Sequence, residues 1–213
     1  MYRHLSHSAT SYQKKAFRYT GFETLLMGNC KMSAWSKVIA AVALSASNVC
    51  VYAALDVGEL APKFTTQAAI AGNVIKYSLS DELQKGPVVL YFFPAAFSDG
   101  CSIEAHNFAE AIEQYSALGA TVVGVSRDDI ETQKKFSVAE CRGKFTVASD
   151  VDQSIMKSYD AVLFFRSDYA NRVSFVISPA GKIIYQYNSL NPAKHVANTM
   201  AALKSWREFG VVK

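Results

Sequence analysis

The stretch Val88 to Glu104, VVLYFFPAAFSDGCSIE, decides the fold. Six consecutive apolar residues, Val88 to Phe93, predict a strand that is buried on both faces. Pro94 ends this strand because it has no N–H to donate. Cys101 follows the capping and turn cluster Ser98-Asp99-Gly100 and precedes an amphipathic pattern. We therefore expect its sulfur in the first turn of a helix, where free N–H groups and the helix dipole stabilise a thiolate.

A second strand follows the helix that begins near Cys101. Apolar residues recur at helical spacing at Phe108, Ile112, Tyr115 and Leu118, and Gly119 supplies a C-terminal stop. Residues 120–126, ATVVGVS, then predict another buried strand. A strand, a helix and a strand of these lengths form a βαβ unit, which requires a parallel pair and a right-handed crossover.

The segments on either side complete the predicted order of elements. A strand is expected at 74–79, a turn or short helical cap at 80–82, a helix at 128–139, a strand at 145–148, a helix at 153–159 and a loop at 161–170. Two strands, 172–178 and 182–187, form a hairpin through Pro179-Ala180-Gly181. Asn191-Pro192 starts a terminal helix with a buried stripe of Val196, Met200 and Leu203. This order predicts an α/β, thioredoxin-like fold, with a mixed central sheet flanked by helices.

The net charge of +4 belongs to the first 53 residues. They hold six Lys and Arg residues and one acidic residue, whereas residues 54–213 hold 16 basic and 17 acidic residues. A charge near zero argues against nucleic acid or another polyanion as the partner of the main domain.

The N-terminal 53 residues are interpreted as a leader, and residues 54–213 as one thioredoxin-like domain. From Met32 the chain shows Lys37 and then an apolar run, Val38 to Val51, with cleavage expected after Ala53. Residues 1–31 lie upstream of the true start if translation begins at Met32 or Met27. The sequence thus predicts export to a bacterial periplasm and no stable membrane association after cleavage, with an uncleaved leader as the alternative.

Two cysteines remain in the main domain after removal of the leader. Cys30 and Cys50 belong to the leader, and Cys101 and Cys141 belong to the domain. Cys50 makes a poor lipoprotein site because the residue before it is not small. Two cysteines in an exported protein usually form a disulfide, so a static structural bridge stays open as the alternative to a reactive thiol.

The sequence around Cys101 resembles a known family. PAAFSDGC, residues 94–101, is similar to the P-x3-[TS]-x2-C signature of peroxiredoxins, with Ser98 where threonine is commoner. VGELAPKFT, GVSRDDIETQKKF, ASD at 148–150 and RVSFVISPAGKI resemble further family segments in the same order. The resemblance covers about residues 57–206, and the bacterioferritin-comigratory branch is the nearest type.

The resemblance implies a thiol-dependent peroxidase without a cofactor or metal. Cys101 would be the peroxidatic nucleophile, and Arg172 the cation that holds both the thiolate and the peroxide. Ser98 would offer its hydroxyl to the peroxide, and Pro94 would shield the pocket from water. Glu104 would orient Arg172, with a solvated helix residue as the open alternative.

Cys141 is the expected resolving residue. Related proteins often carry a cysteine five positions after the first, but His106 stands there. The resemblance implies that the sulfenic acid on Cys101 forms an intramolecular disulfide with Cys141. We expect the two residues to lie well apart in the reduced fold, so that disulfide formation needs backbone movement. The partners would be hydrogen peroxide or an organic hydroperoxide and a reductant, either a thioredoxin-like protein or a small thiol, with the chain a monomer or homodimer.

The other polar residues are assigned structural roles. His106 is expected at the surface or at the rim of the pocket, and His195 is expected to face solvent. The pairs Asp128-Asp129 and Asp150-Asp152 are expected to serve helix starts and turns rather than a metal. Two other functions stay open. A thioredoxin-like thiol-disulfide oxidoreductase would carry cysteine at the position of Ser98. A non-catalytic module that binds copper or a protein would want a second cysteine close after Cys101.

Overall fold

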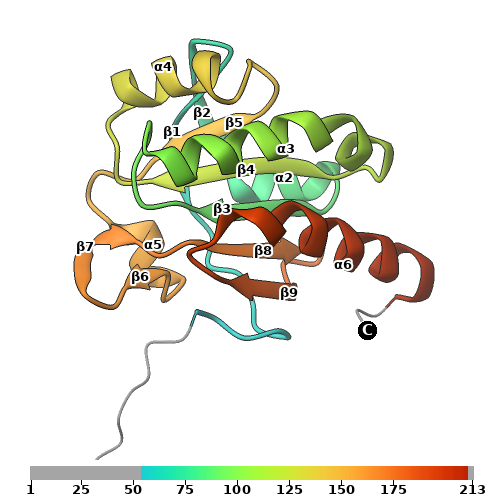
Figure 1. The fold of residues 1–213 in the computed structure, drawn as a ribbon. Coiled ribbons are helices and arrows are strands. Elements are labelled where there is room, and N and C mark those ends of the chain that lie inside the picture. Colours follow the sequence, from blue (N-terminus) through green and yellow to red (C-terminus); the bar gives the residue numbers. More distant parts are fainter. Residues whose placement is uncertain (1–53, 211–213) are drawn as a thin grey trace, which may run out of the picture. The chain divides into compact units, whose positions relative to one another are not determined.

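A computed structural model describes residues 54–210, and the predicted leader lies outside the described residues. Seven strands form the central sheet in the order β2-β1-β5-β4-β3-β8-β9 (Figure 1). They are β1 (Thr65–Ile70), β2 (Asn73–Ser78), β3 (Val88–Phe92), β4 (Thr121–Ser126), β5 (Thr146–Ser149), β8 (Val173–Ile177) and β9 (Ile183–Asn188). The pairs β3–β4 and β4–β5 are parallel and the others are antiparallel, so the predicted mixed sheet is confirmed.

Helices cover both faces of the sheet. They are α2 (Leu79–Lys85), α3 (Asp99–Ala117), α4 (Ile130–Ala139), α5 (Ser154–Ser158), the 3₁₀ helix η1 (Pro192–Lys194) and α6 (His195–Phe209). The helices α3, α4 and α6 pack on one face, where α3 also contacts α6. The helices α2 and α5 contribute their buried residues to the opposite face. The expected βαβ unit is confirmed as β3, α3 and β4.

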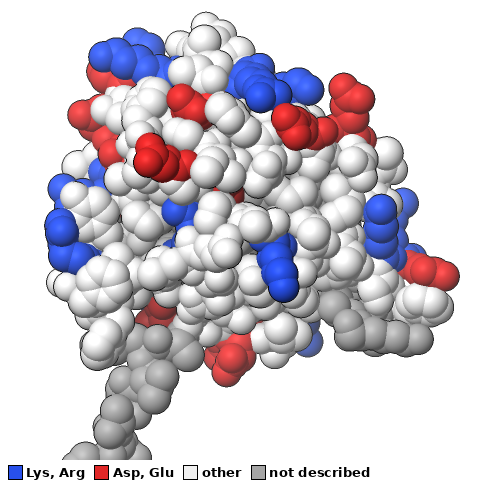
Figure 2. Space-filling model, viewed as in Figure 1, with Lys and Arg blue, Asp and Glu red and all other residues white. Residues whose placement is uncertain are grey.

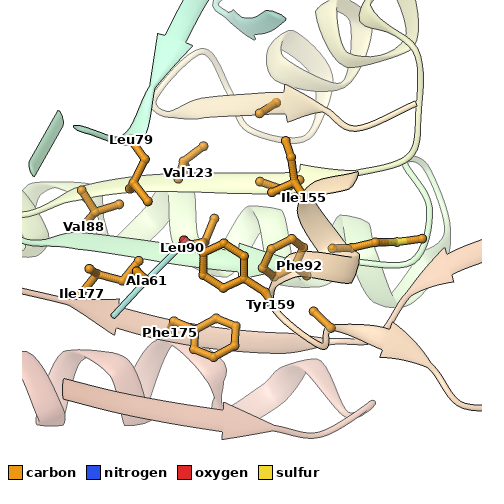
Figure 3. Packing of buried hydrophobic residues seen from close by; sticks show 14 of the residues in the cluster. Ala61, Leu79, Val88, Leu90, Phe92, Val123, Ile155, Tyr159, Phe175 and Ile177 are labelled. Carbon is orange, nitrogen blue, oxygen red and sulfur yellow. The ribbon is translucent and has the colours of Figure 1, made fainter. Parts of the chain in front are cut away.

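The central strand β3 explains why the apolar run forms the middle of the sheet. Every residue of β3 is buried, as is Phe93 after it. Side chains alternate between the faces of a strand. Val88, Leu90 and Phe92 accordingly pack into the cluster on the α2 and α5 side, shown in Figure 3. Val89 and Tyr91 pack into the cluster under α3, α4 and α6, so both faces require an apolar strand.

One predicted loop and one unpredicted strand differ from the sequence-based expectation. Residues 161–170 were expected to form a loop, but they contain the antiparallel pair β6 (Val162–Leu163) and β7 (Arg166–Ala170). Side chains stabilise this hairpin: Arg127 binds Asp168 at 2.7 Å, and the guanidinium groups of Arg127 and Arg166 lie over the ring of Tyr169. The strand β1 was not predicted either.

The C-terminal half follows the predicted order. The strands β8 and β9 form the expected hairpin, and Gly181 adopts a φ of 78° in its turn. The side chain of Asn191 caps η1 by accepting from the N–H of Ala193, and α6 follows directly. The hairpin therefore delivers the residue before β8 and the residues after β9 to the same end of the sheet.

Acidic and basic side chains are interspersed on the face seen in Figure 2. This agrees with the near-balance of charges in residues 54–213. Among residues 54–210, no helix is both long and apolar enough to cross a membrane.

Candidate active site

Cys101 lies in the first turn of α3, as the capping pattern predicted. Its side chain is 1% exposed and belongs to the apolar cluster under α3. The helix begins after Ser98, whose carbonyl accepts from the N–H of Ser102 at 2.9 Å. The sulfur therefore lies at the helix end that favours negative charge.

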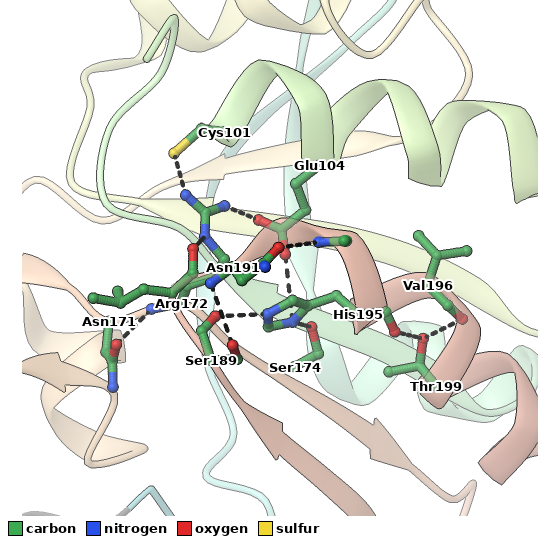
Figure 4. Close-up of polar contacts among 12 residues, drawn as sticks. Cys101, Glu104, Asn171, Arg172, Ser174, Ser189, Asn191, His195, Val196 and Thr199 are labelled. Atoms are coloured by element: carbon green, nitrogen blue, oxygen red, sulfur yellow. Dashed lines mark hydrogen bonds and ion pairs between the residues drawn. The ribbon is translucent and has the colours of Figure 1, made fainter. Parts of the chain in front are cut away.

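Arg172 contacts Cys101 from the other side of the site (Figure 4). It is the residue immediately before β8, and it is 4% exposed. Its Nη2 donates to the sulfur of Cys101 at 3.3 Å, and its Nε donates to the carbonyl of Leu190 at 3.0 Å. Its Nη1 donates to Oε2 of Glu104. Three contacts hold the planar guanidinium, which fixes the direction of its charge toward the sulfur.

Glu104 is buried rather than solvated. It lies one turn after Cys101 on α3 and has no exposed surface, and its Oε2 accepts from Nη1 of Arg172. Of the two alternatives left open by the sequence, contact with Arg172 is therefore the one observed, and a solvated helix residue is not. Burial raises the pKa of Glu104 to about 8, although Arg172 acts in the opposite direction.

His195 contradicts the sequence-based expectation that it faces solvent. It has no exposed surface. Its Nδ1 lies 2.8 Å from Oγ of Ser174 and 3.4 Å from Oε1 of Glu104, and its Nε2 lies 2.8 Å from the carbonyl of Ser189. The prediction was wrong because α6 packs against β8, β9 and α3 together. The helix therefore buries more of its surface than the predicted stripe of Val196, Met200 and Leu203, and His195 lies in the additional buried part. Burial lowers the pKa of His195 to about 4.

The loop between β3 and α3 is held by Asp128. One oxygen of Asp128 accepts from the N–H of Ala96 and from the hydroxyl of Ser126, both at 2.7 Å. Ser98 occupies the N-cap position, but its hydroxyl donates to the carbonyl of Ala95 at 3.1 Å instead of capping the helix. Pro94 is partly buried at the start of this loop. The structure therefore places Pro94 and Ser98 in the segment that leads into Cys101.

Cys141 follows the C-cap residue of α4 and has no exposed surface. Burial raises the pKa of its thiol well above the usual value. Both Cys101 and Cys141 are free thiols. Both belong to the apolar cluster under α3. The static bridge that the sequence left open is therefore not formed in this structure.

Two side-chain contacts join the neighbours of Cys141 to α3. Nε2 of His106 lies 2.9 Å from Oε2 of Glu140, and Nη1 of Arg142 lies 3.3 Å from Oε1 of Glu110. His106 is partly exposed, as predicted. We call these two contacts the Cys141 clasp, because they fasten both sides of the cysteine to the helix that carries Cys101.

Three residues of the acidic pairs, Asp129, Asp150 and Asp152, take the helix-start and turn roles predicted for them, whereas Asp128 holds the loop before α3. Asp129 caps α4 by accepting from the N–H of Thr132, and Asp150 accepts from the N–H groups of Ile155 and Met156 at the start of α5. Asp152 accepts from the N–H of Ser154. Within residues 54–210, no group of three or more His, Cys, Asp and Glu side chains is arranged to hold a metal ion.

A comparison with models of protein families matches residues 57–186 to the AhpC/TSA family. The chain belongs to this family. It is 32% identical over 149 residues to "Peroxiredoxin Q, chloroplastic" of Triticum aestivum, a match that covers 70% of this chain and 66% of that relative. The chain thus spans about two thirds of the length of this relative. It is 27% identical over 154 residues to "Putative peroxiredoxin bcp" of Helicobacter pylori, covering 70% of this chain and 98% of that protein.

Solved structures agree with this placement in the AhpC/TSA family. The crystal structure of peroxidoxin BcpB from Mycobacterium tuberculosis matches with a TM-score of 0.63 at 26% identity, covering 71% of this chain and 97% of that one. The predicted thioredoxin-like fold is confirmed. Together the matches place the chain among peroxiredoxins of the Q and bcp type.

The sequence alone did not indicate a functional role for three residues near the site of this peroxiredoxin, which are Gly100, Asp128 and His195. A Cβ atom on Gly100 would lie 3.1 Å from Nη2 of Arg172, so glycine lets the guanidinium approach the helix end. The sequence predicts that Asp128 starts a helix, but its carboxylate accepts from the N–H of Ala96 and so holds the loop before Cys101. The sequence predicts that His195 lies at the surface, but the structure buries it. Only contacts between distant segments reveal these roles.

Proposed function

We propose that the chain is a thiol-dependent peroxidase in which Cys101 attacks the hydroperoxide. The observation that carries the proposal is the 3.3 Å contact between Nη2 of Arg172 and the sulfur of Cys101 at the N-terminus of α3. A guanidinium and a helix end both stabilise negative charge on the sulfur. The thiolate, not the thiol, is the form that attacks an O–O bond.

The first step makes one S–O bond and breaks one O–O bond. The thiolate of Cys101 attacks the terminal oxygen of the hydroperoxide, and the remaining alkoxide or hydroxide takes a proton from water. Cys101 becomes a sulfenic acid, and the substrate becomes an alcohol or water. Arg172 would stabilise the charge on the leaving oxygen, and the hydroxyl of Ser98 would turn from Ala95 toward the peroxide. Pro94 would limit the entry of water.

The second step is proposed to form a disulfide between Cys101 and Cys141. The thiol of Cys141 attacks the sulfenic acid, and one water molecule leaves. Because Cys141 has no exposed surface and is fastened by the clasp, its segment must open locally before the sulfurs meet. A thioredoxin-like protein or a small thiol would then reduce the disulfide with two electrons.

The setting of the reaction is also proposed. Residues 32–53 would act as a cleaved secretory signal, with residues 1–31 upstream of the true start, so that residues 54–213 work in the periplasm or another exported location. Hydrogen peroxide and organic hydroperoxides are the proposed substrates, and the chain would act as a monomer or homodimer. Lys37, the apolar run Val38 to Val51 and the small residue Ala53 after it support this proposal.

Disulfide mapping tests the second step. The reduced protein is treated with one equivalent of hydrogen peroxide, alkylated and digested, and the linked peptides are identified by mass spectrometry. We expect one intrachain link between Cys101 and Cys141, and none in the matched Cys141→Ser variant, which should retain the sulfenic acid. Links found only between chains would contradict the intramolecular disulfide.

A further inference from the structure

One buried oxygen of the site has no hydrogen-bond partner in the described part of the chain. It is Oε1 of Glu104. The other oxygen of this carboxyl, Oε2, accepts from Arg172. Oε1 points instead toward His195, whose Nδ1 lies 3.4 Å away (Figure 4). Buried polar atoms are nearly always hydrogen-bonded, so this contact needs an explanation.

The surroundings of the imidazole fix where its own proton lies. Nε2 of His195 lies 2.8 Å from the carbonyl of Ser189, and a carbonyl oxygen can only accept. Nε2 therefore carries the hydrogen, and Nδ1 of the neutral ring has a lone pair. Nδ1 has a single lone pair, so a donor on Glu104 would share it with the hydroxyl of Ser174, which lies 2.8 Å away. An ionised Glu104 would place a second acceptor against Nδ1, with no proton between the two atoms.

We propose that His195 is a positioning residue for the reaction: Oε1 of Glu104 carries a proton that it donates to Nδ1 of His195, which leaves the charge of Arg172 directed at Cys101. In this arrangement both carboxyl oxygens are satisfied. The protonated Oε1 donates to the imidazole, and the carbonyl oxygen Oε2 accepts from Nη1 of Arg172. The consequence for Cys101 rests on the proposed peroxidase function, whereas the position of the proton does not.

The balance of buried charge supports this assignment. A thiolate, a guanidinium and a carboxylate would leave one net negative charge out of contact with water, which is costly. One proton on the carboxyl removes that charge. The directions of the pKa values agree, since burial raises that of Glu104 and lowers that of His195. The titratable or charged groups around the ring are Glu104 and Cys101 from α3, Arg172 immediately before β8, Tyr187 from β9 and the exposed Lys194 beside it in the chain.

One short segment supplies several of the contacts. Between the end of β9 and the start of α6, the carbonyl of Ser189 accepts from His195 and the carbonyl of Leu190 accepts from Nε of Arg172. The N–H of Ser189 also donates to the carbonyl of Arg172 at 3.1 Å. Ser189 and Leu190 therefore fix the position of the His195 ring relative to the guanidinium of Arg172. A residue that positions Arg172 needs such a fixed position.

Nitrogen NMR of the imidazole tests the position of the proton directly. The full chain contains four histidines, and the signals lost in His195→Gln identify those of His195. At pH 7 we expect the neutral ring with hydrogen on Nε2. Its Nδ1 signal should shift with a midpoint near pH 8 as Glu104 loses its proton, and this step should be absent in Glu104→Gln. A ring with hydrogen on Nδ1 or on both nitrogens at pH 7, or a step that persists in Glu104→Gln, would overturn the proposal.

Peroxide kinetics test the consequence for the reaction. The amide of the Glu104→Gln variant mimics the protonated carboxyl, because its oxygen accepts from Arg172 and its NH₂ donates to Nδ1. We expect the rate of this variant to lack the decline that the wild-type rate shows above pH 8. His195→Gln should lower the second-order rate by about tenfold. A loss in Glu104→Gln as large as that in His195→Gln would show that a carboxylate is required and would overturn the proposal. A wild-type protein without peroxidase activity would instead refute the proposed function and leave the NMR test intact.

Discussion

Nη2 of Arg172 lies 3.3 Å from the sulfur of Cys101, although 71 positions separate the two residues in the sequence. The parallel unit β3–α3–β4 brings the cysteine to one end of the sheet, and β8, which pairs with β3, brings the arginine to the same end. The buried carboxyl of Glu104 contacts the same guanidinium, so the charge of Arg172 is held between Cys101 and Glu104.

Replacement of Arg172 by lysine should lower the second-order rate with peroxide by about a hundredfold, because one preorganised donor to developing charge is lost. An ammonium on a flexible chain cannot keep the contacts with Cys101, Glu104 and Leu190 together. Stopped-flow measurement of peroxide consumption in a single turnover checks this. Arg127→Lys, which alters a partly exposed pair, is the control and should stay close to wild type. Equal rates for Arg172→Lys and wild type would contradict the role of the guanidinium.

Gly100→Ala should slow the reaction with peroxide by about tenfold without unfolding the protein, since small displacements of a catalytic group are costly. The added methyl group would lie 3.1 Å from Nη2 of Arg172 and push it by a few tenths of an ångström. Ser102→Ala, in the same turn of α3, is the matched control for helix stability. If both variants react alike, the close approach of Arg172 to the helix end is unimportant.

The stability of the fold should decrease as the pH rises from about 6.5 to 8. The pKa of Glu104 is raised from 4.5 to about 8 in the folded state, so between these values the folded state binds more protons than the unfolded state. Stability falls with pH wherever that is so. The lowered pKa of His195 acts in the opposite direction, but only below 6.5. Urea unfolding at several pH values should show the decline in wild type and its loss in Glu104→Gln. A decline of the same size in both would assign it to another group.

Weakening the Cys141 clasp should accelerate disulfide formation by a few fold, since partly exposed ion pairs each contribute about 0–1 kcal/mol. The double variant His106→Gln, Glu110→Gln removes one partner from each of the two contacts. Quenched alkylation after peroxide addition gives the rate of disulfide formation, and peroxide consumption in the first step should stay unchanged. Glu113→Gln, exposed on the same helix, serves as the control. A slower disulfide in the double variant would mean that the clasp guides the cysteine instead of restraining it.

The sequence predicted the centre of the fold because β3 is apolar on both faces, which few structures other than a central strand satisfy. The hairpin of β8 and β9 and the start of α6 were also predictable, since Gly181 and Asn191 act through local geometry. The strand β7 was missed because its residues do not alternate and the hairpin depends on Arg127, far away in the sequence.

Part of the candidate site could also be predicted from the sequence, and part could not. The resemblance to the family indicated Cys101 through the signature and Arg172 through the segment RVSFVISPAGKI, and the structure brings the two residues into contact. The environment of Glu104 stayed open, because a carboxylate one turn into a helix usually meets water. The burial of His195 could not be read from the sequence, since its partners Ser174, Ser189 and Glu104 come from three separate segments.

The most direct test of the central claim is the peroxidase activity of Cys101→Ser. Residues 54–213 are incubated with a dithiol and hydrogen peroxide, and peroxide consumption is compared among wild type, Cys101→Ser and Cys141→Ser. We expect Cys101→Ser to consume peroxide no faster than the dithiol alone, while Cys141→Ser still completes the first turnover. Unchanged peroxide consumption in Cys101→Ser would contradict the assignment of Cys101 as the nucleophile.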